Sequence, residues 1–241
     1  MSTREDWMRR LGPLYGGAVA LVHSTPWRWP DTIGNEARSS FWVVAVGAPI
    51  GLLAWVAAAL IEGAGFPVYI GALVGLAVLS LASAALVERG LVERLDGPHA
   101  TAPSAPAILV LVFTTLIRAA AIVSVGAGDW LGVFIATALV GRWAAVFLQA
   151  LGDPIMDDDA PRSFVATPAP AWLTGALSVG VAIVTVVALG KAGVVALAIT
   201  AGVAFALGLY AQRRDRGLSS PVVATAAAVG ELVVLLVATL A

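Results

Sequence analysis

The chain has 241 residues, of which 60% are hydrophobic and 12% are charged, whereas soluble domains average roughly 45–50% and about 25%. Its formal net charge of −1 argues against a nucleic-acid partner, because nucleic-acid-binding domains carry a strong basic excess. The absence of cysteine excludes disulfides, thiolate metal sites and cysteine nucleophiles. A bilayer is the environment that suits such a composition.

The first 40 residues differ in kind from the rest. The segment Asp6–Pro30 places three tryptophans beside arginines, and aromatic rings next to arginine suit the headgroup layer of a membrane. Pro26 and Pro30 interrupt any helix there. The apolar run Leu14–Val22 is too short to span a bilayer. We therefore expect residues 1–40 to form an interfacial or half-inserted hairpin that interacts with lipid.

The remainder of the chain is dominated by long apolar stretches. A spanning helix needs roughly 20 mostly apolar residues, and glycine and alanine recur throughout these stretches, as they do where membrane helices pack closely. We predict an all-α fold, a polytopic membrane helix bundle in which residues 1–241 form one integral membrane domain and residues 41–241 form the bundle. The seven predicted spans are Phe41–Ile61, Pro67–Val87, Ala105–Val125, Trp130–Leu151, Ala171–Gly190, Ala192–Tyr210 and Pro221–Ala241.

Basic residues between these spans are distributed very unevenly. Eleven arginines fall before the first predicted span or after the second, fourth and sixth, whereas Lys191 alone lies on the other side. Positive charge is enriched on the cytoplasmic side of membrane proteins. We therefore predict a multi-pass protein of the cell inner membrane with a cytoplasmic N-terminus and a C-terminus on the far side.

Two polar segments on the predicted cytoplasmic side concentrate carboxylates. Residues 87–99 follow the second span as an expected loop and contain Glu93 and Asp96, and residues 152–159 include Asp157, Asp158 and Asp159. Carboxylate oxygens are suitable ligands for a hard divalent cation such as Mg²⁺. The alternative is that both segments are solvated helix ends, in which neighbouring acidic and basic side chains compensate one another.

Three ionisable residues, Arg118, Arg142 and Glu231, fall inside predicted spans. Charges at such depths are costly and usually face the bundle interior or a polar cavity. We predict that Glu231 faces the interior within reach of a polar or cationic partner. A structural pairing with Arg118 or Arg142 and a substrate-contacting role both remain open.

Three segments carry a family resemblance. Residues 85–97 read A-L-V-E-R-G-L-V-E-R-L-D-G, residues 141–145 read G-R-W-A-A, and residues 230–232 read G-E-L. Their order resembles the cobalamin synthase (adenosylcobinamide-GDP ribazoletransferase) family over nearly the whole chain, whose motif after the second span reads roughly A-L-H-L-D-G-L-A-D-T-A-D-G. The resemblance implies transfer of α-ribazole or its phosphate to a GDP-activated corrinoid, with Mg²⁺ on the diphosphate. It assigns Asp96 and Glu93 to catalysis and metal binding, and Arg89, Arg142 and Glu231 to substrate binding.

The motif departs from the family at its acidic positions. Arg89 stands where the family has its first aspartate and Glu93 where it has its second, while Asp96 is kept. A fixed guanidinium repels a metal ion, but it can hold a phosphate directly. Either the metal site has moved onto residues 157–159 together with Glu93 and Asp96, or the chain no longer carries out the reaction.

Three hypotheses follow for the function. The first is a ribazoletransferase-like enzyme. The second is a non-catalytic paralogue that binds a corrinoid nucleotide, a lipid, or a protein partner, whether another membrane subunit or a second copy of itself. The third is a small transporter, although the sequence shows no inverted repeat of the kind many transporters have.

Overall fold

Every secondary-structure element in the described part of the chain is helical. The computed structural model describes residues 3–27, 39–97, 102–153, 155 and 170–240. These residues form α-helices and two short 3₁₀ turns and contain no β-strand, so the predicted all-α class is confirmed. The α-helices are α1 (Thr3–Leu11), α2 (Tyr15–Ser24), α3 (Ser39–Ala45), α4 (Gly47–Gly63), α5 (Val68–Ala82), α6 (Leu86–Asp96), α7 (Ala105–Val125), α8 (Trp130–Leu151), α9 (Ala171–Leu189), α10 (Lys191–Asp215) and α11 (Ser220–Ala238).

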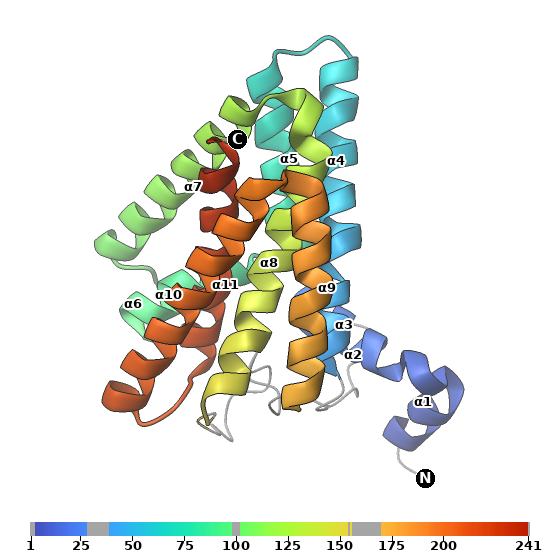
Figure 1. The fold of residues 1–241 in the computed structure, drawn as a ribbon, viewed down its shortest axis with the longest axis vertical. Helices are drawn as coiled ribbons and strands as arrows, with labels where there is room; N and C mark the ends of the chain where they lie inside the picture. Colours follow the sequence, from blue (N-terminus) through green and yellow to red (C-terminus); the bar gives the residue numbers. More distant parts are fainter. Residues whose placement is uncertain (1–2, 28–38, 98–101, 154, 156–169, 241) are drawn as a thin grey trace.

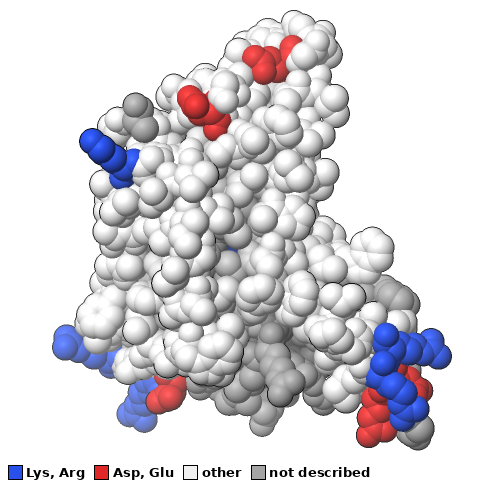
Figure 2. Space-filling view, turned by 45° about the vertical axis from the view of Figure 1, so that its right-hand side comes forward, with Lys and Arg blue, Asp and Glu red and all other residues white. Residues whose placement is uncertain are grey.

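The long helices run alternately up and down the molecule (Figure 1). Six helical stretches are long and apolar enough to cross a membrane, and a seventh results if α5 and the bent α6 are taken as one span. Charged side chains gather at the two ends of the molecule, with a broad uncharged band between them (Figure 2). The chain is therefore a multi-pass membrane protein. We refer to the end that carries the N-terminus and Arg213, Arg214 and Arg216 as the basic end.

Helix α8 is the axis around which the others pack (Figure 1). About 78% of its spanning window is buried inside the protein, against 22% for α7 and α9. A Cβ atom added to Gly47 would lie 2.8 Å from the carbonyl oxygen of Ala138, and one added to Gly51 would lie 2.6 Å from that of Phe134. Only glycine allows α4 to approach the backbone of α8 so closely.

The second predicted span is interrupted, and this corrects the sequence analysis. Helix α5 ends at Ala82, and α6 leaves it at an angle of 70°. Between them Ala84 and Ala85 adopt left-handed φ values of 53° and 51°. The expectation of a continuous span over Pro67–Val87 was therefore wrong.

The segment expected as a loop after the second span is largely helical as well. Helix α6 runs to Asp96, because its apolar residues recur at helical spacing and bury Leu86, Val87 and Gly90. Gly90 is required at the contact with α11, since an added Cβ would lie only 2.1 Å from that of Ala224. The dense charges of this segment thus belong to an amphipathic helix.

The N-terminal segment forms two short helices beside the basic end (Figure 1). With nine residues in α1 and ten in α2, neither can span a bilayer. Helix α2 packs on α3, where Gly17 lies close to the ring of Trp42, while Trp27 is 63% exposed. The interfacial or half-inserted position expected for this segment stays a prediction. Residues 28–38 lie outside the described part of the chain.

Candidate functional site

A cluster of charged side chains lies inside the bundle, at the joint between α5 and α6. We define the buried charge cluster as Glu88, Arg118, Arg142 and Glu231. Arg118 on α7 is at its centre, donating from Nη1 to Glu88 Oε1 at 2.9 Å and from Nη2 to Glu231 Oε2. Arg118 and Glu231 are only 2% and 3% exposed. The prediction that Glu231 faces the interior beside a polar or cationic partner is confirmed.

Arg142 completes the cluster from α8. Its guanidinium is 2% exposed and donates to the carbonyl of Ala138 at 3.2 Å and to Ser83 Oγ at 2.9 Å. These acceptors are neutral, but Glu231 attracts both Arg118 and Arg142 electrostatically. Two arginines and two glutamates therefore balance each other's charge within the bundle, as buried charges require.

Two glycines make this arrangement possible, and each directly precedes a charged member of the cluster. A Cβ on Gly141 would lie 2.5 Å from Glu231 Cγ, and one on Gly230 would lie 3.2 Å from Gly141 Cα. Helices α8 and α11 therefore cross at backbone contact. The crossing carries Arg142 and Glu231 to the same depth in the bundle.

The joint between α5 and α6 is held from both sides by the same cluster. Ser80, on the last turn of α5, donates to Glu88 Oε1 at 2.6 Å, while Ser83 accepts from Arg142. The left-handed conformations of Ala84 and Ala85 cost roughly 1–2 kcal/mol each. The ionic contacts of the joint offset this strain and set the direction in which α6 leaves α5.

Some polar atoms of the cluster have no partner within the described residues. They are Glu88 Oε2, Arg118 Nε and Arg142 Nε. Such orphaned groups are the usual partners of buried water. Glu88 is 22% exposed, so the cluster reaches the protein surface along α6. It can hold polar ligands or protons in a charge-balanced interior, but it offers no unshared carboxylate pair.

The other predicted site residues lie elsewhere on α6. Asp96 is eight residues beyond Glu88, about 12 Å along the helix. Both of its carboxylate oxygens are engaged by Ser104, Oδ2 by the backbone N–H at 2.8 Å and Oδ1 by the hydroxyl. This contact ties the end of α6 to the start of α7. Glu93 is half-buried and Arg89 is exposed.

The described carboxylates do not fit the expected Mg²⁺ ion. Within the described residues, no group of three or more acidic or histidine side chains gathers at metal-binding distance. Asp96 already accepts two hydrogen bonds from Ser104 at the start of α7. Arg89 adds a positive charge one helical turn from Glu93. Asp157, Asp158 and Asp159 lie outside the described residues.

Glu88 is the site residue that the sequence analysis missed. From the sequence it is only one of the carboxylates of residues 87–99 that could either bind a cation or compensate a neighbouring basic side chain. In the structure Glu88 faces α7, where it pairs with Arg118 at 2.9 Å, while Arg89 is exposed. The helical period alone does not identify Glu88, because its partner Arg118 comes from a different helix.

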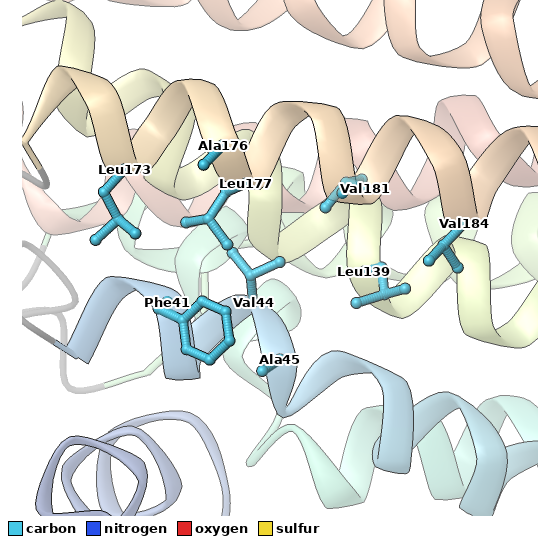
Figure 3. Close-up of a pocket in the computed structure, with 10 residues that line it drawn as sticks. Phe41, Val44, Ala45, Leu139, Leu173, Ala176, Leu177, Val181 and Val184 are labelled. Atoms are coloured by element: carbon cyan, nitrogen blue, oxygen red, sulfur yellow. The ribbon is translucent and has the colours of Figure 1, made fainter. Parts of the chain in front are cut away.

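A separate groove of about 370 Å³ lies between α3, α8 and α9 (Figure 3). All ten lining residues are apolar, among them Phe41, Leu139, Leu173 and Val184. The groove contains no acid, base or nucleophile and can contribute only dispersion contacts with apolar groups. We therefore place the candidate chemistry in the cluster and on α6.

Comparison with known proteins does not identify a function for the chain. No protein-family model, no curated protein and no solved structure matches the chain.

Replacing Glu231 by glutamine tests the cluster. The variant removes one charge from a buried network, and we expect it to lower the free energy of unfolding by about 3–5 kcal/mol. Arg118→Met removes the partner of the same contact, so the two substitutions should not be additive. The double variant should lose at least about 1 kcal/mol less unfolding free energy than the sum of the losses in the two single variants. Reversible unfolding by SDS in mixed micelles measures both quantities.

The control is Arg94→Gln, which breaks the 2.9 Å pair with Asp215. Both partners of that pair are 25–30% exposed, so its loss should cost less than about 1 kcal/mol. Equal costs for Glu231→Gln and Arg94→Gln would show that the buried charge cluster does not stabilise the bundle.

Proposed function

We propose that the chain is a cobalamin synthase-like membrane protein that binds a phosphate-bearing corrinoid nucleotide without transferring ribazole to it. The observation that carries this proposal is the engagement of Asp96. This is the aspartate that the motif retains, and Ser104 occupies both of its oxygens. A carboxylate used in this way is poorly suited to a metal ion, while Arg89 stands where the family has an acidic residue.

Arg89 supports the binding role directly. It is exposed on α6, and the next residue, Gly90, packs directly against α11 and fixes the helix there. Guanidinium groups bind phosphate through two parallel hydrogen bonds without a metal ion. A rigid amphipathic helix that presents an arginine can therefore hold the diphosphate that the resemblance implies.

We also propose that the basic end faces the cytoplasm of the cell. The eleven-to-one distribution of basic residues supports this orientation, and it gives α6 access to soluble nucleotides. The C-terminus then lies on the far side of the inner membrane, at the end of α11.

A retained transferase is the second candidate. Glu93 favours it, since this acidic side chain is half-buried on α6 rather than enclosed, and it lies in the motif register of the family. Mg²⁺ would supply charge neutralisation on the diphosphate, with Glu93 and residues 157–159 as the carboxylates available to hold it. Metal dependence separates the two candidates.

Complementation and binding together test the proposed function. In a strain lacking cobalamin synthase, correctly inserted wild-type protein should not restore cobalamin synthesis. The purified protein should nevertheless bind adenosylcobinamide-GDP equally well with and without EDTA. Arg89→Gln should weaken binding at least about tenfold, because a charge-assisted hydrogen bond contributes about 1.5–3 kcal/mol.

Arg9→Gln is a matched control, since it removes one positive charge from the same end of the molecule without touching α6, and it should leave the affinity unchanged. Rescue by the wild type that is lost in Asp96→Ala would favour the transferase instead. If neither rescue nor binding is detected, the corrinoid proposal should be abandoned.

Cysteine labelling tests the orientation against a background free of native cysteine. Gly128→Cys lies in the turn between α7 and α8, where an added Cβ meets nothing within 4 Å. Gln212→Cys is exposed near the basic end of α10. In intact cells an impermeant maleimide should label position 128 and spare position 212. The opposite pattern would invert the proposed orientation.

A further inference from the structure

Tyr210 marks the depth at which α10 leaves the apolar band. Nineteen residues separate it from Lys191 at the other end of the helix, a rise of about 28 Å. This length is close to the hydrocarbon thickness of a bilayer, about 30 Å. Arg213 and Arg214 follow in the last turn. Tyr210 therefore lies at the level of the lipid headgroups, where tyrosine is enriched.

Two arginines from different helices converge on the Tyr210 ring. The guanidinium carbon of Arg94 lies 5.8 Å from the ring centroid and that of Arg214 lies 5.7 Å from it. Arg214 also donates to the tyrosine hydroxyl, and Arg94 is paired with Asp215 at 2.9 Å. Both guanidinium groups are thus held in place by the protein.

The charge at this corner is not balanced by the bonded carboxylate. Asp215 pairs with Arg94, while Arg213, Arg214 and Arg216 are exposed. The two cations that converge on one ring lie no more than about 12 Å apart. An excess of fixed positive charge at headgroup depth attracts a phosphate anion.

We propose that this arginine corner, formed by Arg94, Tyr210, Arg213 and Arg214, binds the phosphate of an anionic phospholipid headgroup. Exposed guanidinium donors can contact the phosphate oxygens, and the tyrosine ring beneath them positions Arg94 and Arg214. The position of Tyr210 at the end of the apolar run favours a lipid over a free phosphate, because the acyl chains of a lipid bound there extend alongside α10. The site is separate from Arg89 and does not depend on the proposed function.

Native mass spectrometry of the full chain in detergent micelles tests this site. The protein is titrated with phosphatidylglycerol or with phosphatidylcholine, and the bound fraction gives each affinity. We expect the wild type to prefer phosphatidylglycerol. Arg214→Gln should weaken phosphatidylglycerol binding about fivefold, because one arginine near an anionic surface contributes about that factor. Tyr210→Phe keeps the ring but loses the contact with Arg214, and it should weaken binding about threefold.

Lys191→Gln is the matched control, because it removes one exposed positive charge from the opposite end of the same helix. It should leave phosphatidylglycerol binding unchanged. Equal binding of the two lipids by the wild type, or equal losses in Arg214→Gln and Lys191→Gln, would overturn the proposal. Displacement of the lipid by millimolar inorganic phosphate would overturn the assignment to a lipid.

Discussion

Arg118 places a full positive charge inside α7, a helix long and apolar enough to cross the membrane. Hydrocarbon does not tolerate such a charge alone. In the bundle, Glu88 and Glu231 each accept a hydrogen bond from one of the two terminal nitrogens of Arg118. Each of these partners comes from a different helix. The positions of α6, α7 and α11 are thus linked through one guanidinium.

The consequences of this contact extend to the backbone. Glu88 can reach Arg118 only if α6 begins well inside the bundle, which requires the abrupt bend after α5 and the left-handed Ala84 and Ala85. Glu231 can reach it only if α11 lies directly against α8, which requires glycine at 141 and 230. Strained backbone and unusually close crossings are found together where the surrounding structure compensates for them.

The same contact shapes the functional proposal. With Glu88 anchored to Arg118, α6 is held against α7, and Arg89 is exposed. The far end of α6 is fixed by Asp96 and Ser104. Glu88 and Asp96, two of the carboxylates of α6, thus hold the helix in place, which is the basis for proposing ligand binding without metal.

The sequence predicted the features that depend on local pattern. Long apolar runs identified the crossings, and the cost of burying a charge placed Glu231 in the interior. The bend after α5 could not be predicted, because left-handed backbone is usually indicated by glycine or asparagine, and Ala84 and Ala85 are neither. The Asp96–Ser104 contact and the role of Glu88 were missed because both depend on how helices are arranged in space.

Hydrogen–deuterium exchange of the α6 backbone is the most direct test of the account, because it reports whether the buried charge cluster holds this helix. In the wild type, amides of residues 88–96 should be protected to a degree comparable with those of α11. In Arg118→Met, exchange in α6 should rise by at least about tenfold while α8 remains protected. Fast exchange of α6 in the wild type, or no change in the variant, would contradict the central role of Arg118.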